Sequence, residues 1–241
     1  SKKYIISPLI TWVVPYLVAL RLSPNVVSIL GMLCGVVAAC FLYLHTVSLY
    51  YSLAALLMLL IWHVMDGADG RVARITGKQS DLGKIIDGVC DYIVFASLYI
   101  SLTLVLSVTY GPSIWYLAVV AGVAHSLQAS AYELQRQEFE FWGAGKASAE
   151  LPSLSDADER LARLSGFAKL AARVDIFYTR MQYWVTGLEQ NIRPVLYQYL
   201  EENPEKTDEF RVAYRSECAP QVLKWAVMCP HYRSLLIVFS C

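Results

Sequence analysis

Two long stretches of this chain contain no basic residue: Lys and Arg are absent from position 22 to position 70, and again from 85 to 135. Both stretches are mostly apolar, and the whole chain of 241 residues is 56% hydrophobic and 17% charged, with a mean hydropathy of +0.44. A typical soluble domain carries about 25% charged residues. We therefore expect an all-α, polytopic helical membrane protein.

The apolar runs predict the positions of the helices. Residues 4–20 are apolar, but the run is short and contains Pro8 and Pro15, which favours a helix lying in the membrane interface over a straight span. The final apolar run, 232–241, is too short to cross a bilayer and is interpreted as the start of a further segment. We expect at least four transmembrane helices here and six in the full protein, the four lying at about 26–44, 50–65, 83–108 and 114–132.

The positions of the charges predict the topology. The turns at 45–49 and 109–113 lack Lys and Arg, whereas Arg21, the segment 71–84 and the region from Arg136 onward carry them. The positive-inside rule places the basic segments in the cytoplasm. The predicted organisation is an interfacial helix at 1–20, a transmembrane core at 21–132, a cytoplasmic helical insertion at 133–220 with helices near 156–172 and 174–200, and the further segment at 221–241.

Overall charge and cysteine content add little to the prediction of function. Lys plus Arg and Asp plus Glu each number 20, so the net charge is zero and implies nothing about nucleic acid. The six cysteines include no CxxC pair and are interpreted as small apolar residues.

Four aspartates lie where the second and third spans meet the membrane surface. Asp66 and Asp69 are spaced i, i+3 at the end of one span, and Asp87 and Asp91 are spaced i, i+4 at the start of the next. Each pair shares a helix face, and the short loop between the spans lets the pairs converge. Converging carboxylates repel one another unless a cation lies between them. Oxygen ligands of this kind suit Mg²⁺, Mn²⁺ or Ca²⁺, and four acids suffice for two ions.

Small and basic residues surround these acids. Gly70, Ala73 and Gly83 leave space for a ligand, and an arginine beside metal-bound carboxylates is suited to hold phosphate. This combination predicts phosphoryl transfer onto or from a lipid at the bilayer surface. The alternatives are a structural ion-pair cluster with the nearby basic residues, a cation transporter, and an intramembrane aspartyl protease. The basic residues concerned are Arg71, Arg74, Lys78 and Lys84.

The complete pattern resembles the signature of a known family. The residues Asp66-x2-Asp69-Gly70-x2-Ala73-Arg74-x8-Gly83-x3-Asp87-x3-Asp91 are similar, without a departure, to the motif of the CDP-alcohol phosphatidyltransferases, also called CDP-alcohol phosphotransferases. Ser23-Pro24-Asn25 resembles the Thr/Ser-Pro-Asn that many members carry before the first span. The likeness covers residues 1–132 and extends poorly into the insertion.

The resemblance implies a two-metal site that uses Mg²⁺ or Mn²⁺. Asp66 and Asp87 would contact both ions, Asp69 one ion and Asp91 the other, and Asp91 would also be the general base. The CMP portion of the donor would lie against Asp69, Gly70, Ala73, Arg74 and Gly83, with Asn25 reaching the diphosphate.

The resemblance also implies a reaction in phospholipid synthesis. The enzyme would be a transferase of substituted phosphate groups that moves a phosphatidyl group from CDP-diacylglycerol to a small polar alcohol, such as inositol, inositol phosphate, glycerol phosphate or serine, and releases CMP. The alternative is a CDP-choline or CDP-ethanolamine donor with a lipid hydroxyl as acceptor, because both subfamilies share the motif. The expected partners are a CDP-linked donor, an alcohol and membrane lipid, with no nucleic acid. Homodimers are common in families that resemble this chain.

A polar stripe on the fourth span and the aromatic residues of the insertion complete the predictions. The stripe consists of His125, Gln128, Tyr132 and Arg136. Hydrogen bonding between helices is the interpretation for His125, whereas Tyr132 and Arg136, together with Arg71, are predicted to contact the acceptor or a phosphate. We predict a packed or interfacial helix face for Phe177, Tyr178, Tyr183, Trp184 and Tyr197, and solvated or headgroup-facing positions for Arg173, Arg180 and Arg193.

Overall fold

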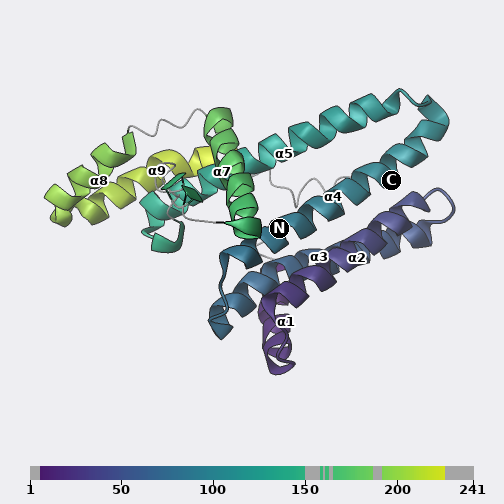
Figure 1. Ribbon diagram of the computed structural model, residues 1–241, viewed down its shortest axis with the longest axis horizontal. Helices are drawn as coiled ribbons and strands as arrows, with labels where there is room; N and C mark the ends of the chain where they lie inside the picture. The colour runs from purple at the N-terminus through teal and green to yellow at the C-terminus, as the bar shows by residue number, and fades with distance from the viewer. Residues whose placement is uncertain (1–5, 150–157, 160, 163–164, 187–191, 226–241) are drawn as a thin grey trace. The chain divides into compact units, whose positions relative to one another are not determined.

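The computed structural model describes residues 6–149, 158–159, 161–162, 165–186 and 192–225 (Figure 1). These residues form helices and turns, and the described ranges contain no strand, which confirms the predicted all-α class. They divide between Val123 and Ala124 into two compact units. The first unit contains the predicted aspartate pairs, and the second contains most of the predicted insertion.

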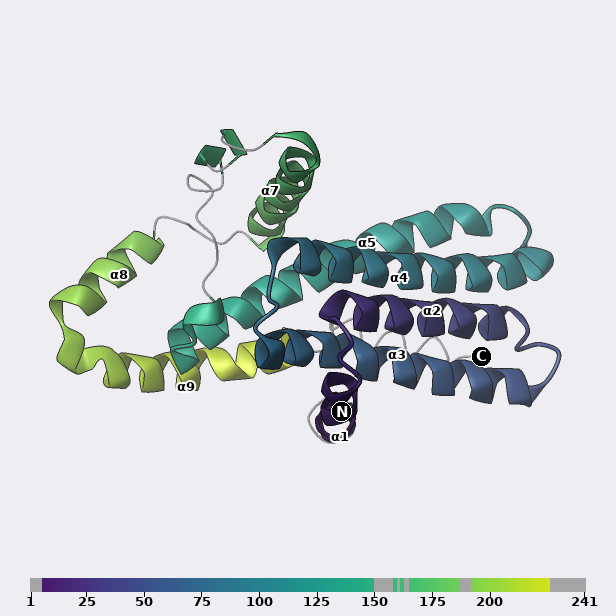
Figure 2. The same ribbon diagram turned by 60° about the horizontal axis from the view of Figure 1, so that its bottom comes forward.

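Four helices are long and apolar enough to cross a membrane, as predicted: α2 (Pro24–Tyr43), α3 (Leu49–Thr76), α4 (Asp81–Tyr110) and α5 (Ile114–Glu138). In Figure 2, α2, α3 and α4 run side by side. Each of the four matches a predicted span in position. The chain is therefore a multi-pass membrane protein.

Local sequence sets where these helices begin and end. The Ser23 side chain caps α2, and Pro24 lies in the first turn. Backbone N–H groups of a first turn have no partner within the helix, so proline, which lacks an N–H, loses no hydrogen bond there. Gly77 ends α3 in the left-handed conformation (φ 65°), and the Lys78 N–H donates to the Ala73 carbonyl over 3.0 Å. Ser80 then caps α4 by accepting a hydrogen bond from the Gly83 N–H at 3.0 Å.

The helices of the second and fourth spans continue beyond the predicted ends of those spans. α3 does not stop near Met65 but runs to Thr76, and α5 runs to Glu138 instead of stopping near Tyr132. Neither extension contains a proline, and both contain good helix formers. Asp66 and Asp69 are consequently held within a continuous helix, which fixes their spacing.

The helix α1 (Ser7–Ala19) packs against α3. Ile10, Val14 and Leu17 on α1 form one buried apolar cluster with Ala68 and Val72 on α3. A Cβ at Gly67 would lie 2.3 Å from Ile10 Cδ1, so the Ile10 side chain would have to move. α1 crosses the direction of the spans in both ribbon views, and its 13 residues are too few to span a bilayer (Figures 1 and 2). The membrane-interface position of α1 stays a prediction that this orientation supports.

Glycines let α2 approach its two neighbours closely. A Cβ at Gly31 would lie 2.9 Å from Met65 Cβ on α3, and one at Gly35 would lie 2.5 Å from Val94 Cγ2 on α4. Leu42, Leu59 and Leu98 fill the core between these three helices. This tight packing holds the candidate site residues on α2, α3 and α4 next to one another.

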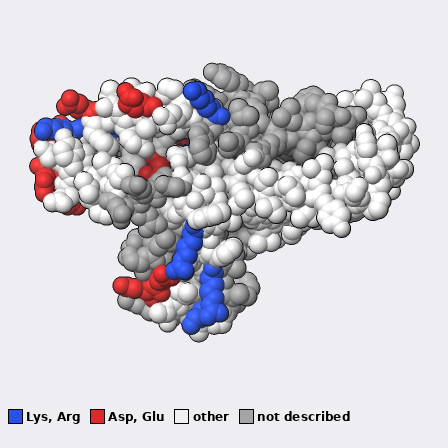
Figure 3. All heavy atoms as spheres, turned by 90° about the horizontal axis from the view of Figure 1, so that it is seen from above, with Lys and Arg blue, Asp and Glu red and all other residues white. Residues whose placement is uncertain are grey.

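Outward side chains of the spans are apolar. Leu33, Leu57, Ile93 and Val120 are each exposed by 40–65%. On the face drawn in Figure 3, the right-hand part, where the spans end far from the aspartates, shows no described Lys, Arg, Asp or Glu. An apolar exposed surface of this kind is suited to lipid.

The second unit consists of the end of α5, a π-helical turn η2 (Phe139–Gly143), a short turn η3 (Ala147–Ala149), and further helices. The predicted helix boundary near residue 173 is wrong, because α7 runs through it without a break. The predicted further segment lies mainly at 226–241, outside the described residues. The further elements are α7 (Gly166–Thr186), α8 (Ile192–Glu202), η4 (Pro204–Lys206) and α9 (Thr207–Trp225).

Candidate active site

Asp69 is the most buried of the four predicted acids, with 5% of its surface exposed. The Ser28 hydroxyl on α2 donates to Asp69 Oδ2 over 2.5 Å, a length typical of a hydroxyl bonded to a carboxylate. The backbone N–H of Gly70 donates to the other oxygen, Oδ1. Ser28 Oγ also lies 3.2 Å from the Pro24 carbonyl oxygen, but the hydroxyl has one proton and Asp69 Oδ2 is the nearer acceptor. α2 therefore fixes the orientation of a carboxylate on α3.

The other three acids gather around Asp69. The carboxyl group of Asp87 on α4 is hydrogen-bonded to that of Asp69, and it also interacts electrostatically with Asp66 and Asp91. All three of these acids are half-buried. The structure thus brings together Asp66, Asp69, Asp87 and Asp91, which we call the aspartate cluster.

The donor set of the aspartate cluster fits a divalent cation. Two carboxyl groups can lie in hydrogen-bonding contact, as those of Asp69 and Asp87 do, only if a proton or a cation offsets their repulsion. Carboxylate oxygens are the ligands that Mg²⁺ and Mn²⁺ prefer. Within the described residues, no group of three or more His, Cys, Asp or Glu is already arranged to hold a metal ion. Binding of a metal ion would therefore require the carboxylates of the aspartate cluster to move closer together.

Two of the predicted pocket glycines lie against residues of the same motif. A Cβ at Gly83 would lie 3.3 Å from Asn25 Oδ1, so the start of α2 meets the first turn of α4. A Cβ at Gly70 would lie 3.7 Å from Arg74 Nη1. Arg74 is exposed and Ala73 is half-buried. The structure therefore places Asn25 beside Gly83, and Arg74 beside Gly70.

Arg71 is held by the N-terminal helix. Its guanidinium donates to Thr11 Oγ1 at 2.7 Å and to Ser7 Oγ at 3.0 Å. These bonds tie α3 to α1 just beyond the aspartate cluster. The predicted contact of Arg71 with the acceptor or a phosphate remains a prediction. Its two hydrogen bonds to hydroxyl groups also give Arg71 a structural role, which is to connect α3 to α1.

Tyr132 and Arg136 belong to the second unit, and their predicted contact with the acceptor or a phosphate is untested. The Arg136 guanidinium donates to Glu133 at 2.9 Å and to Glu140 at 2.8 Å. These two acids already balance its charge. His125 is buried, with 5% exposed.

A buried ion pair in the second unit was missed by the sequence analysis. Arg193 Nη2 lies 2.5 Å from Glu138 Oε1, and the two side chains are 11% and 7% exposed. Trp142 Nε1 donates to Glu138 Oε2 at 2.8 Å, and Arg193 Nη1 donates to the Tyr183 hydroxyl at 3.3 Å. The predicted solvated or headgroup-facing position of Arg193 is wrong, because its side chain is buried against Glu138, whose charge compensates for the burial.

The aromatic residues of the insertion do not form one face. Tyr183 is buried, and Tyr197 packs 5.0 Å from Trp142 between ring centroids, so both are packed as predicted. Phe177 and Trp184 are instead exposed by 70% and 81%. The side chain of Tyr178 lies outside the described part.

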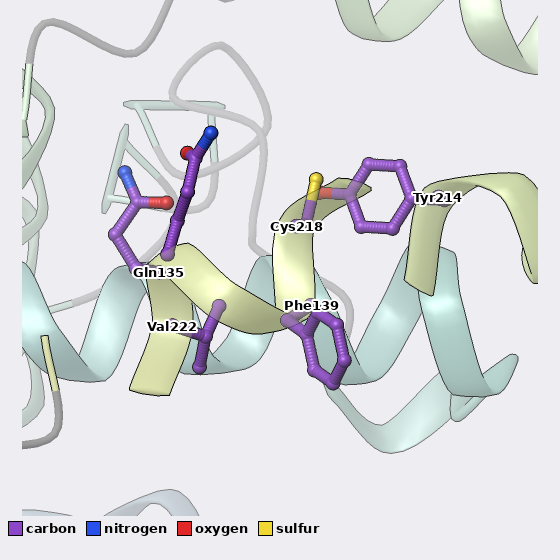
Figure 4. A pocket seen from close by; sticks show the side chains of 6 residues that line it. Gln135, Phe139, Tyr214, Cys218 and Val222 are labelled. Atoms are coloured by element: carbon purple, nitrogen blue, oxygen red, sulfur yellow. The ribbon is translucent and has the colours of Figure 1, made fainter. Parts of the chain in front are cut away.

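The hollows found in the second unit are too small for a CDP-linked lipid. One of about 90 Å³ lies between α5 and α9 and is lined by Gln135, Phe139, Tyr214, Cys218, Gln221 and Val222 (Figure 4). Burial raises the pKa of Tyr214 above its ordinary value. A second hollow of about 220 Å³ lies beside Trp142 and Arg211. Ligand pockets usually enclose about 300–1,000 Å³, and neither hollow includes a member of the aspartate cluster.

Ser28 is the site residue that the sequence analysis did not identify. It follows Asn25 by three positions, so the two share a face of α2. Helical spacing from Asn25 was the signal that could have pointed to it.

The fold and the aspartate cluster define a multi-pass helical membrane protein with a carboxylate site shared by α2, α3 and α4. Residues 21–149 match the model of the family described as CDP-alcohol phosphatidyltransferase, and the chain belongs to that family. The resemblance drawn from the motif is therefore confirmed.

A curated relative carries the same family name. It is the "Uncharacterized CDP-alcohol phosphatidyltransferase class-I family protein 2" of Dictyostelium discoideum, 29% identical over 112 residues, which are 43% of this chain and 26% of the relative. The match thus spans about a quarter of the relative's length. No solved structure matches the chain.

Proposed function

We propose that this protein transfers a phosphatidyl group from CDP-diacylglycerol to a small polar alcohol and releases CMP, as a step in phospholipid synthesis. The observation that carries the proposal is the convergence of Asp66 and Asp69 on α3 with Asp87 and Asp91 on α4. Family membership supports the same reaction class.

The aspartate cluster would hold two divalent ions, Mg²⁺ or Mn²⁺. Asp66 and Asp87 would bind both, Asp69 one and Asp91 the other. When bound, the ions supply positive charge that offsets the negative charge of the diphosphate and of the departing CMP.

Asp91 is the proposed general base. Its carboxylate accepts the proton of the acceptor hydroxyl as that oxygen attacks the phosphorus atom that carries the lipid. A new P–O bond forms to the acceptor, and the bond from this phosphorus to the bridging oxygen breaks. CMP leaves with the electron pair of that bond, and the proton on Asp91 passes to solvent.

The residues around the cluster would bind the donor. Gly70, Ala73 and Gly83 leave backbone and space for the CMP portion beside Asp69, and Arg74 supplies charge to a phosphate. Asn25, which lies next to Gly83, could donate to the diphosphate. Ser28 would hold Asp69 in one rotamer and so orient this carboxylate for binding an ion.

The proposed site faces the cytoplasm, where the basic residues of the 71–84 segment lie by the positive-inside rule. Exposed apolar side chains on the same helices, such as Val26, Ile29 and Val89, would let the acyl chains of a lipid substrate remain in the bilayer.

The test is an assay of CMP release. Purified protein is incubated with Mg²⁺ or Mn²⁺ and with CDP-diacylglycerol or CDP-choline, against a set of acceptor alcohols and diacylglycerol. CMP released from CDP-diacylglycerol by wild type, and not by Asp91→Asn, is the expected result. CMP formed only from CDP-choline would assign the lipid as acceptor instead. Absence of CMP with every pairing, or equal release by both forms, would overturn the proposal, and metal-ion flux without CMP would favour a transporter.

A further inference from the structure

We propose that α7 docks on the surface of a lipid bilayer that contains anionic headgroups, through a stripe formed by Arg173, Phe177, Arg180 and Trp184. The inference concerns the second unit alone and does not depend on the transferase reaction. It rests on the exposure of these residues, on the charge they carry, and on the contacts that hold α7 to a membrane-spanning helix.

The four residues lie on one side of α7. Their spacing of four, three and four positions keeps them within a narrow arc of the helix. Ile176, Thr179 and Tyr183, which lie on the adjoining side of the helix, are each 7% exposed. α7 therefore turns one face inward to the unit and presents the stripe outward.

The stripe exposes large aromatic surface to the surroundings. Trp184 is 81% exposed and Phe177 is 70% exposed. Amphipathic helices that lie on membranes commonly carry Trp, Phe and basic residues together, because the rings enter the headgroup layer while the cations bind phosphates. Two large exposed aromatic side chains on one side of a helix therefore indicate a surface that binds another apolar surface.

Charge favours an anionic surface as that cover. Arg173 is exposed, and Arg180 is 57% exposed while it donates to Asp158 over 2.8 Å. Asp158 is 48% exposed, so solvent weakens this pair and the arginine can turn to a lipid phosphate. A basic side chain near an anionic leaflet strengthens binding by about fivefold.

Contacts within the second unit connect α7 to the end of α5. The Tyr183 hydroxyl accepts a hydrogen bond from Arg193, and Arg193 pairs with Glu138 at the end of α5. α5 belongs to a candidate span that extends from Ile114 to Gly143. The inward face of α7 is thus linked through Arg193 to the end of a candidate span, which favours lipid over a distant partner.

The test is site-specific photocrosslinking in the complete protein. The photoreactive residue p-benzoylphenylalanine replaces Phe177 or, separately, Trp184, and the protein is reconstituted into vesicles of phosphatidylcholine with or without phosphatidylserine. Val212 on α9, which is 58% exposed, is the matched control position. Size-exclusion profiles equal to that of wild type confirm that the variants are folded.

We expect phospholipid adducts at positions 177 and 184 in several-fold excess over position 212. The yield at 177 should fall roughly fivefold or more when phosphatidylserine is omitted, and also when Arg173→Gln and Arg180→Gln are combined. Adducts to a second copy of the chain in place of lipid, an absence of lipid adducts at both stripe positions, or a yield equal to that of position 212 would overturn the proposal.

Discussion

Asp69 and Glu138 are equally buried, each with 5% of its surface exposed, yet their neighbours are opposite in charge. Glu138 lies against the guanidinium of Arg193 and the indole N–H of Trp142. Asp69 lies against the Ser28 hydroxyl and the carboxyl group of a second acid, Asp87. The first acid is paired with a cation within the protein, whereas the second lies among other carboxyl groups. A buried acid of the first kind maintains the fold, and a group of the second kind is suited to bind a cation.

The largest expected effect is on the chemistry of the aspartate cluster. Replacing Asp91 with Asn should slow CMP release by about 10²- to 10⁴-fold, because the amide cannot accept the proton of the acceptor. Thermal unfolding of the variant should match that of wild type. A rate within twofold of wild type would remove Asp91 from the role of base.

The two buried acids should respond oppositely to neutralisation. Glu138→Gln leaves Arg193 buried without its counter-charge, and we expect the free energy of unfolding to fall by about 3–5 kcal/mol. Asp69→Asn in metal-free protein relieves repulsion with Asp87 and retains an oxygen for the Ser28 hydroxyl, so stability should stay equal or rise. Both are measured by denaturation in detergent with EDTA. A large loss of stability in Asp69→Asn alone would reverse the comparison.

Sequence reasoning was most successful where periodicity and spacing decide the structure. Uninterrupted apolar runs located α2 to α5, and the spacing of Asp66, Asp69, Asp87 and Asp91 predicted that they meet. Convergence follows because the four-residue turn at 77–80 keeps the end of α3 close to the start of α4, while both helices pack against α2.

Contacts between distant segments could not be predicted in the same way. Ser28 and Asp69 are 41 positions apart, and their bond depends on the close approach of α2 and α3 at Gly31. The pairing of Arg193 with Glu138 likewise requires α8 to return to the end of α5. Arginines in polar stretches of sequence are usually exposed to solvent. The burial of Arg193 could therefore be predicted only if Glu138 were known to lie beside it.

Removal of the Ser28 hydroxyl tests how Asp69 is held. Ser28→Ala should raise the Mn²⁺ concentration needed for half-saturation by about 10- to 100-fold, since a hydrogen bond to a ligating group orients it toward the metal. Ser52→Ala is the control, because Ser52 is a buried serine in the first turn of α3, far from Asp69 along that helix. Equal Mn²⁺ affinity in Ser28→Ala and wild type would show that the bond does not position the ligand.

The smallest expected effect concerns pH and the second unit. Burial raises the pKa of Tyr214 above its ordinary value of 10.0. The folded state therefore retains the proton more strongly, and the stabilisation is present below pH 10 and is lost as the pH rises beyond it. Tyr214→Phe should make thermal stability less dependent on pH above 10. Tyr199→Phe, on the exposed side of α8, should leave the pH dependence as in wild type, and the same slope in all three proteins would contradict the prediction.

Equilibrium binding of Mn²⁺, followed by electron paramagnetic resonance on EDTA-treated and dialysed protein, tests the central claim most directly. The account predicts saturable binding of two ions per chain in wild type and a loss of at least one in Asp87→Asn, with Glu138→Gln binding as wild type where it remains folded. Absence of saturable binding to wild type, or the same stoichiometry and affinity in Asp87→Asn, would contradict the assignment of the aspartate cluster as a metal site.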